Sequence, residues 1–250
     1  MFDYKAPEQL LKDKVILVTG AGDGIGKAAA ITYAQYGATV ILLGRTAKKL
    51  DIVYDIIKEQ GYPEAAIVPL NLDGAGEHDY SELANTIKSE FGHLDGVLHN
   101  ASLLGERTPL SAYDANTFEQ VMKVNVHSQF LLNQALLPLL EKSPNASIVF
   151  TTSSVGRKAR AYWGAYAISK FATEAMMQLL ADELGNISNI RSNAINPGAT
   201  RTQMRAAAYP AENPETLPTP EEIMPVYLYL MGNDSLNING QSLDAQAQKA

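Results

Sequence analysis

Short apolar runs alternate along this chain with longer segments whose polar and apolar residues follow a helical pattern. The runs occupy residues 15–19, 38–43, 66–70, 96–99, 147–150 and 192–195. Continuous apolar strands indicate a parallel sheet that is covered on both faces, because a face open to water would produce alternation. The sequence therefore predicts a doubly wound α/β fold with helices on both faces of the sheet. A last run near residues 241–244 predicts an edge strand, which makes about seven strands.

The length and composition are consistent with one domain. The chain has 250 residues, of which 46% are hydrophobic, so it can bury a full core. No repeat, low-complexity tract or linker divides it, and we expect a single domain over residues 1–250. Four prolines between Gly198 and Glu222 break any regular helix, and such a long connection is typical of a lid or a disordered segment. We predict a lid over residues 198–222.

Composition also excludes several classes of function. The formal net charge is −7 and basic residues form no long cluster, so a nucleic-acid partner is not expected. The absence of cysteine excludes disulfides, thiolate metal ligands and cysteine nucleophiles, and the four histidines lack metal-ligand spacing. No signal-peptide core is present, and no stretch approaches the ~20 apolar residues of a membrane span. We expect a cytoplasmic protein with no metal site and no membrane association.

A glycine-rich loop follows the first predicted strand directly. Residues 19–26 read Thr-Gly-Ala-Gly-Asp-Gly-Ile-Gly and open a helix-patterned stretch, where glycines let the backbone approach a pyrophosphate at the helix N-terminus. The loop predicts nucleotide or dinucleotide binding through Gly20, Gly22, Asp23 and the segment 24–26, Gly-Ile-Gly. An ordinary tight turn is the alternative. S-adenosylmethionine also fits such a loop, so the loop alone does not name the cofactor.

The end of the second strand bears on the choice of dinucleotide. An acidic residue about 20 residues beyond the loop would bind the ribose 2′-hydroxyl of NAD, but this chain has Arg45 there. An arginine suits a 2′-phosphate, whereas the negative charge of Asp23 in the loop opposes one. We therefore favour NADP(H), with NAD(H) as the alternative. Arg45 could also be a solvated surface charge.

Four polar residues are spaced so that they could share one proton. Tyr166 and Lys170 are four residues apart at the start of a predicted helix, so the ammonium is expected to lower the tyrosine pKa. Ser153, or alternatively Ser154, follows a buried strand and can hydrogen-bond a substrate oxygen. Asn125 completes the set, although a buried asparagine can instead satisfy backbone groups. Tyr166 as general acid or base predicts carbonyl reduction or alcohol oxidation.

The spacing of Tyr166 and Lys170 is not specific by itself. Tyr54 and Lys58 have the same spacing, but they lie in the helix after the second strand, and Ile41 stands thirteen residues before Tyr54. Ser153 stands thirteen residues before Tyr166, at a strand end. Because ligands bind at strand carboxyl ends in open α/β sheets, we predict that only the second pair is catalytic.

Five motifs together resemble the short-chain dehydrogenase/reductase family over essentially the whole chain. They fall in the family's order: the loop 19–26, His99-Asn-Ala-Ser102, Val124-Asn125, Ser153 with Tyr166-Ala-Ile-Ser-Lys170, and Asn196-Pro-Gly198. The resemblance implies a Rossmann fold and an NAD(P)(H)-dependent oxidoreductase. Segments 154–157 and 196–202 are similar, more narrowly, to the YciK-like bacterial oxidoreductases.

The resemblance also implies roles for individual residues. Tyr166 would be the acid/base, Lys170 would bind the nicotinamide ribose, Ser153 would polarise the carbonyl, and Asn125 would hold a water of a proton relay. The remaining cofactor contacts that it implies are Asn71, Leu72, Asn100, Ala101, Pro197, Gly198, Thr200 and Thr202. His99 and Ser102 depart from the family's Asn-Asn-Ala-Gly motif, and residues 239–246 lack its paired glycines.

We therefore expect hydride transfer between nicotinamide and a small-molecule carbonyl or secondary alcohol. Small and apolar residues in 204–209 hint at a partly apolar substrate, and Arg205 could meet a carboxylate. The alternatives are a catalytically silent dinucleotide-binding regulatory protein and an S-adenosylmethionine-dependent transferase. The family resemblance implies a homotetramer or dimer, with helices around 114–140 and 166–184 between subunits.

Overall fold

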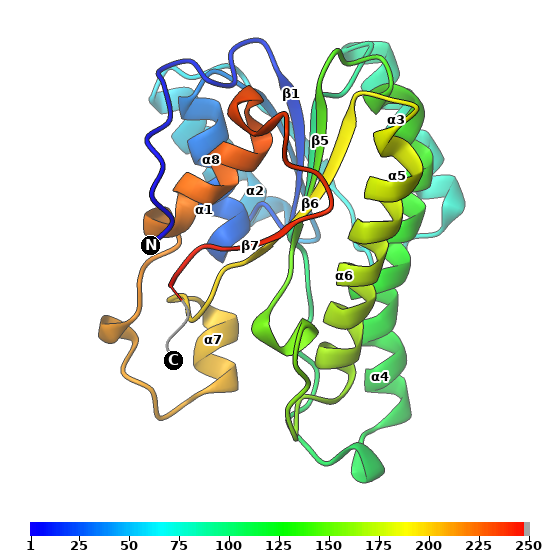
Figure 1. Cartoon of the computed structure of the whole chain (residues 1–250), viewed down its shortest axis with the longest axis vertical. Coiled ribbons are helices and arrows are strands. Elements are labelled where there is room, and N and C mark those ends of the chain that lie inside the picture. The colour runs from blue at the N-terminus through cyan, green and yellow to red at the C-terminus, as the bar shows by residue number, and fades with distance from the viewer. Residues whose placement is uncertain (248–250) are drawn as a thin grey trace.

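A computed structural model of the chain, described here for residues 1–247, contains one seven-stranded sheet (Figure 1). All six strand pairs are parallel, and the order is β3-β2-β1-β4-β5-β6-β7. The strands are β1 (Val15–Thr19), β2 (Thr39–Gly44), β3 (Ala66–Pro69), β4 (Gly96–His99), β5 (Ala146–Thr151), β6 (Ile190–Asn196) and β7 (Ser242–Asp244). The predicted doubly wound fold and its edge strand are confirmed.

Helices cover both faces of this sheet. Helices α1, α2 and α8 contact one another or the strands on one side, and α3 to α6 pack together on the other (Figure 1). Their bounds are α1 (Gly24–Gln35), α2 (Ala47–Glu59), α3 (Glu77–Glu90), α4 (Ala115–Met122), α5 (Ser128–Leu140), α6 (Gly164–Gly185), α7 (Gln203–Ala208) and α8 (Met224–Met231). A π-helical turn, η2 (Lys123–His127), joins α4 to α5. Short 3₁₀ turns are η1 (Leu110–Ala112), η3 (Ser154–Gly156), η4 (Pro214–Thr216), η5 (Glu221–Ile223) and η6 (Asn233–Ser235).

The strands are apolar throughout because successive side chains enter two different cores. In β1, Ile16 and Val18 pack with the α1 and α8 side, whereas Val15 and Leu17 pack with the α3 and α5 side. Every residue of β1 is buried, as are all residues of β4, β5 and β6. The sheet is therefore a rigid support for the loops that leave its carboxyl ends.

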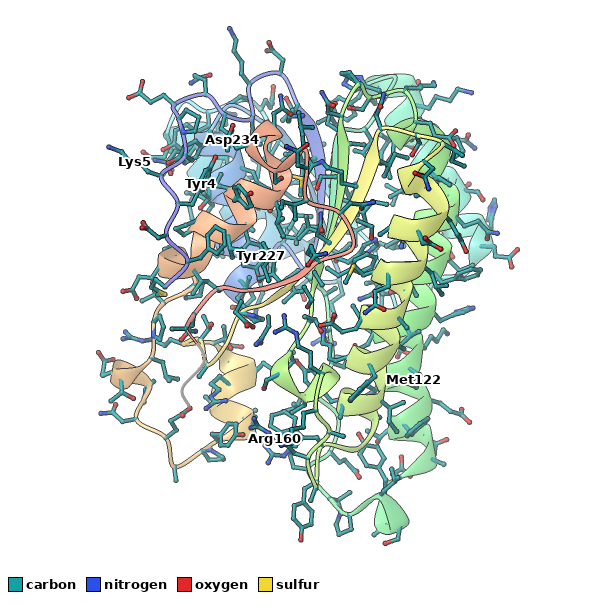
Figure 2. All side chains as sticks on the ribbon, in the orientation of Figure 1. Tyr4, Lys5, Met122, Arg160, Tyr227 and Asp234 are labelled. Atoms are coloured by element: carbon teal, nitrogen blue, oxygen red, sulfur yellow. The ribbon has the colours of Figure 1, made fainter. Side chains whose placement is uncertain are left out.

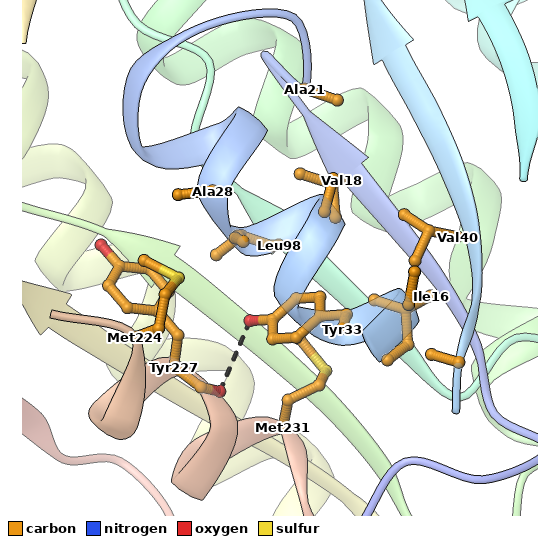
Figure 3. Packing of buried hydrophobic residues seen from close by; sticks show 14 of the residues in the cluster. Ile16, Val18, Ala21, Ala28, Tyr33, Val40, Leu98, Met224, Tyr227 and Met231 are labelled. Atoms are coloured by element: carbon orange, nitrogen blue, oxygen red, sulfur yellow. Dashed lines mark hydrogen bonds between the residues drawn. The ribbon is translucent and has the colours of Figure 1, made fainter. Parts of the chain in front are cut away.

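Figure 3 shows the packing between α1 and α8 in the first of these cores. Tyr33 and Tyr227 are fully buried, and the Tyr33 hydroxyl donates to the Tyr227 carbonyl oxygen over 3.4 Å. Met231 lies beside Tyr33, and Met224, on the same helix, lies beside Tyr227. Since a buried hydroxyl is costly without a partner, this bond fixes how α1 and α8 are paired.

The segment before β1 packs on the outside of α8. The Tyr4 hydroxyl donates to Asp234 over 2.8 Å, and both residues lie at this side of the molecule in Figure 2. The rings of Phe2 and Tyr4 contact that of Tyr229, and the Phe2 amide donates to the Ala245 carbonyl. Residues 2–4 thus lie between α8 and the residue that follows β7.

Strand β6 begins at Ile190, two residues before the apolar run that predicted it. The run missed this start because Arg191, a charged residue, lies inside the strand. Arg191 is 6% exposed, and its guanidinium donates to the carbonyl oxygens of Leu230, Gly232 and Ser235 at the end of α8. Burial lowers the Arg191 pKa to about 10. A cation inside a strand is stabilised here by the carbonyl end of a helix.

The predicted lid, residues 198–222, contains α7 followed by the turns η4 and the start of η5. It folds back on itself, since the Arg201 amide donates to the Pro218 carbonyl over 2.8 Å. In Figure 1, α7 lies across from the start of α6 at the end of the sheet where β6 ends. Among residues 1–247, no helix has the length and hydropathy that crossing a bilayer requires.

Candidate active site

A cleft of about 710 Å³ opens at the carboxyl ends of the strands. Its walls are the segments that follow β1 to β6, which is where ligands bind in open α/β sheets. The predicted site residues that line it are Gly20, Gly22, Asp23, Gly24, Ile25, Arg45, Asn71, Leu72, Asn100, Ala101, Ser153, Tyr166, Lys170, Pro197, Gly198, Thr200 and Thr202. Two predicted residues, Gly26 and Asn125, lie behind its surface.

The glycine loop is closely packed against the loop that follows β4. Gly20 has a φ of +69°, which favours glycine, and a Cβ atom on Gly26 would overlap the Gly20 carbonyl oxygen. Thr19 Oγ1 accepts hydrogen bonds from the amides of Asn100 and Ala101, over 2.9 and 3.0 Å. This packing leaves the start of α1 open toward the cleft.

Asp23 caps the start of α1 and is paired with a lysine that the sequence analysis missed. Its carboxylate accepts from the Gly24 amide over 2.8 Å and from Lys49 Nζ over 2.5 Å. The lysine bond is the main reason that the Asp23 pKa is lowered. Lys49 lies on α2 and lines the cleft together with Arg45 and Thr46. Its signal in the sequence is its place four residues after Arg45, in the first turn of α2.

Two further parts of the cleft come from the ends of β3 and β4. Asn71 is exposed and Leu72 is buried, and both face the cleft. After β4 and β5, respectively, Ser102 Oγ and Thr152 Oγ1 are buried without a hydrogen-bond partner in the described part of the chain. Both Ser102 and Thr152 line the cleft. Unpaired buried hydroxyls in a cleft are suited to a polar ligand.

His99 departs from the family motif and has a structural role. Its ring stacks on Phe150 at a centroid distance of 4.7 Å, and Nε2 is bonded to Asn133 Oδ1 over 2.9 Å. Burial lowers the His99 pKa to about 4, so the imidazole is neutral. It holds the end of β4 against β5 and does not line the cleft.

Tyr166, Ser153 and Lys170 meet at the middle of the cleft. Tyr166 is 8% exposed, and Ser153, at the end of β5, shares a hydrogen bond with its side chain. Lys170 is 1% exposed, and its Nζ donates to the Thr151 carbonyl over 2.8 Å and lies 5.5 Å from the centre of the Tyr166 ring. Helix α6 and strand β5 therefore bring the three side chains together. Ser154, the alternative to Ser153, lies in η3 and does not line the cleft.

The prediction that the Tyr166 pKa is lowered is wrong. Burial raises the pKa of its hydroxyl to about 12, and the hydrogen bond of Ser153 offsets part of that effect. Burial also lowers the Lys170 pKa to about 8, although Glu174 acts in the opposite direction. The spacing places the two groups together as predicted, but desolvation has the larger effect on both.

Asn125 lies in the π-helical turn and is fully buried. Its Oδ1 accepts from the Leu103 amide over 2.7 Å, and its Nδ2 donates to the Leu103 carbonyl and to Ser169 Oγ. Leu103 itself lines the cleft. These bonds match the alternative use of this asparagine, in which it satisfies backbone groups.

The turn after β6 is held by the last strand and the residues that follow it. Asp244 Oδ1 accepts from Asn196 Nδ2 over 2.8 Å and from Arg157 Nη1 over 2.7 Å. Gln246 Nε2 donates to the Pro197 and Ala199 carbonyls over 2.8 and 3.0 Å. Residues 239–246, which lack the family's paired glycines, thus connect Arg157, in the loop after Ser153, to the turn that contains Gly198. Sequence reasoning had assigned it no such contact.

Comparison with known proteins places this geometry in a family. The family model for short chain dehydrogenases matches residues 14–213. The oxidoreductase YciK of Escherichia coli K12 is 54% identical over 97% of this chain and 96% of its own length.

Two solved structures are similar along nearly the whole chain. A short chain dehydrogenase from Pseudomonas syringae is 61% identical with a TM-score of 0.97, over 98% of this chain and 100% of that one. One from Escherichia coli CFT073, complexed with NADPH, is 56% identical with a TM-score of 0.92, over 96% and 100%. The resemblance to YciK-like oxidoreductases is confirmed, and this chain belongs to the short-chain dehydrogenase family.

Proposed function

We propose that the protein is an NADP(H)-dependent oxidoreductase that transfers hydride between nicotinamide and a carbonyl or secondary alcohol carbon. The observation that carries the proposal is that Tyr166, Ser153 and Lys170 meet in the middle of a cleft that has the glycine loop at one end. One end supplies a site for a dinucleotide and the middle supplies a proton donor.

The residues of the cleft fit a dinucleotide. The glycine loop leaves room at the start of α1, where the first amides of a helix can bind a pyrophosphate. The unpaired hydroxyls of Ser102 and Thr152 provide polar contacts nearer the middle of the cleft. When bound, the nicotinamide supplies or accepts the hydride. Lys170 and Thr202 lie where they could hold its ribose and amide.

A preference for NADP(H) is supported by the charges around Arg45. Asp23, whose negative charge argued against a 2′-phosphate, is neutralised by Lys49 in an ion pair of 2.5 Å. Arg45 and Thr46 face the same part of the cleft. The Escherichia coli CFT073 relative was solved with NADPH, which agrees with this preference.

The preference can be measured with Arg45→Ser. We expect this variant to raise KM for NADPH about 10- to 100-fold, because a charge-assisted bond to phosphate is lost, and to change KM for NADH less than about twofold. Lys58→Ser, also in the segment after β2 but not lining the cleft, is the control. Equal losses with both cofactors would argue against a 2′-phosphate contact.

In carbonyl reduction, Tyr166 gives its hydroxyl proton to the substrate oxygen while Ser153 hydrogen-bonds to that oxygen. The phenolate that forms on Tyr166 is stabilised by the Lys170 ammonium, whose Nζ is positioned by Thr151. In alcohol oxidation the same groups act in reverse. Asn125 positions Leu103 at the edge of the cleft, and its role in a water relay stays a prediction.

The reaction is tested by following nicotinamide absorbance with a panel of aldehydes, ketones and alcohols, for the native chain and Tyr166→Phe. We expect turnover that depends on Tyr166. Binding of NADPH without Tyr166-dependent turnover of any compound would favour the alternative of a silent regulatory protein. A thermal shift with S-adenosylmethionine and none with NADPH would favour the transferase.

Assembly and location stay predictions. Helix α6 exposes Ile168, Phe171 and Leu179, and α5 exposes Phe130, on the helices expected between subunits. Exposed apolar side chains on neighbouring helices are typical of subunit contacts. Light scattering after gel filtration distinguishes the expected tetramer or dimer from a monomer, and fractionation of cells tests the cytoplasmic location.

A further inference from the structure

Apolar side chains from three separate segments form one wall of the cleft beside Tyr166. Leu104 comes from the loop after β4, Trp163 precedes α6, and Met204 and Ala208 lie on α7. Trp163 is 8% exposed, and its ring lies 5.7 Å from that of Tyr166. We call these four residues the apolar wall. Convergence of apolar side chains next to a proton donor is typical of a site for an apolar ligand body.

The wall is held from outside by an arginine. The Arg107 guanidinium lies 4.1 Å from the centre of the Trp163 ring and 5.2 Å from that of Tyr209. Arg107 also donates to the carbonyl oxygens of Tyr162 and Ala208, over 3.2 and 2.8 Å. It is exposed and does not line the cleft, so its charge remains in solvent. Trp163 and α7 are thereby fixed to each other as one surface.

The cation that does face the cleft here is already paired. Arg205 on α7 forms two hydrogen bonds with the Glu212 carboxylate, over 2.6 and 2.7 Å. Its guanidinium also lies 3.8 Å from the centre of the Tyr209 ring. A bidentate arginine–carboxylate pair occupies the guanidinium edge that a substrate carboxylate would use. The carboxylate contact that the sequence suggested for Arg205 is therefore made within the protein.

The other charged groups that line the cleft come from segments that do not form the wall. Within the described residues, the remaining charged groups that line the cleft are Asp23, Arg45, Lys49, Asp73 and Lys170. The first four belong to the glycine loop, the end of β2, α2 and the segment after β3, and Lys170 lies beside Tyr166. Arg160 lies at the same end of the molecule as α7, but it is exposed and does not line the cleft (Figure 2). A carboxylate against the wall would lose water without gaining a free cation.

We propose that the substrate is an uncharged carbonyl compound or secondary alcohol with a ring-sized apolar body that lies against Trp163. This inference rests on the proposed function and assigns its substrate class. Trp163 and Met204 provide the contact surface, while the Arg205–Glu212 pair excludes carboxylates. The apolar wall thus selects for shape and against charge.

Trp163 is the single tryptophan of the chain, so its fluorescence reports on the wall without turnover. The protein, saturated with NADP⁺, is titrated with ethyl benzoylformate and with benzoylformate, which share a ring and a ketone but differ in charge. We expect the ester to change the fluorescence with a Kd at least about tenfold lower than the acid, since the acid must desolvate a charge. Equal or tighter binding of the acid, or no response to either compound, would overturn the inference.

A variant tests the role of the ion pair. Glu212→Gln frees Arg205, and we expect it to tighten binding of benzoylformate about tenfold while the Kd of the ester changes less than twofold. Glu215→Gln is the matched control, because Glu215 lies in the same segment and forms a 3.6 Å pair with Arg201 while being 76% exposed. An acid affinity that Glu212→Gln leaves unchanged would contradict exclusion by this pair.

NADPH oxidation separates this inference from the proposed function. Ester binding without NADPH oxidation would count against the proposed reaction but support the substrate class of the wall. Oxidation that is faster with the acid than with the ester would support the reaction and overturn the substrate class.

Discussion

Two tyrosine–lysine pairs in this molecule have the same spacing and nearly the same geometry, but different surroundings. Lys58 Nζ lies 5.8 Å from the centre of the Tyr54 ring on α2, and Lys170 Nζ lies 5.5 Å from that of Tyr166 on α6. Helical spacing sets this distance in both cases. The chemistry of each pair therefore depends on what else surrounds it.

The first pair belongs to the surface and the second to the cleft. Tyr54 donates to Glu64 over 2.7 Å in an exposed hydrogen bond, which raises the Tyr54 pKa. Tyr166 is buried, hydrogen-bonded to Ser153, and lies beside a lysine whose pKa burial lowers to about 8. A carboxylate partner keeps a phenol protonated and offers no path to a substrate. Location at the carboxyl ends of the strands gives the second pair its proposed function.

The sharpest test compares the two hydroxyls. Tyr166→Phe should lower kcat for carbonyl reduction about 10²- to 10⁴-fold, because the proton donor is lost, whereas Tyr54→Phe should leave kcat unchanged. Nicotinamide absorbance measures both, and NADPH binding by Tyr166→Phe controls for folding. Comparable activity in the two variants would remove the distinction between the pairs.

Substitution of the two lysines should produce a somewhat smaller difference in kcat than substitution of the two tyrosines. Lys170→Met should lower kcat about 10²-fold, since the ammonium that stabilises the Tyr166 phenolate is lost, and Lys58→Met should have no effect. Steady-state rates at saturating NADPH measure this. Retention of full activity by Lys170→Met would mean that Thr151 holds a purely structural lysine.

The hydroxyl partners offer a third comparison. Ser153→Ala should lower kcat about 30-fold, because a hydrogen bond to the substrate oxygen is lost in the transition state. Glu64→Gln, at the partner of Tyr54, should change neither kcat nor KM. If Ser154→Ala has the larger effect instead, the polarising hydroxyl comes from η3.

The pH profile distinguishes the pairs without changing Tyr166. Lys170 carries its charge below its pKa of about 8 and loses it above, while Tyr166, with a pKa of about 12, stays protonated. The reduction rate should therefore be level below pH 8 and fall about tenfold per pH unit above it. Lys58→Met should show the same profile as the native chain. A rate that rises between pH 8 and 10 would contradict this assignment.

The smallest expected effect concerns the exposed pair. Glu64→Gln should leave the unfolding temperature unchanged within error, because an exposed hydrogen bond is largely offset by water. Differential scanning calorimetry measures this. A large loss of stability would show that Tyr54 and Glu64 fix the approach of α2 to β3.

The sequence alone determined much of the fold and the site. Continuous apolar runs specify strands buried on both faces. The glycine loop, Asn100 and Ser153 follow strand ends, and Tyr166 and Lys170 are one helical turn apart on α6, where the structure forms its cleft. These features are local in the chain or follow from where a strand ends, so a pattern can carry them.

The tertiary structure decided what depends on distant partners and on burial. Lys49 neutralises Asp23, Glu212 occupies Arg205, and Arg191 enters a strand because carbonyl groups from α8 receive its charge. Burial also reversed the expected direction of the Tyr166 pKa. Spacing along a helix shows which side chains lie close together, whereas desolvation and pairing across the fold determine their charge.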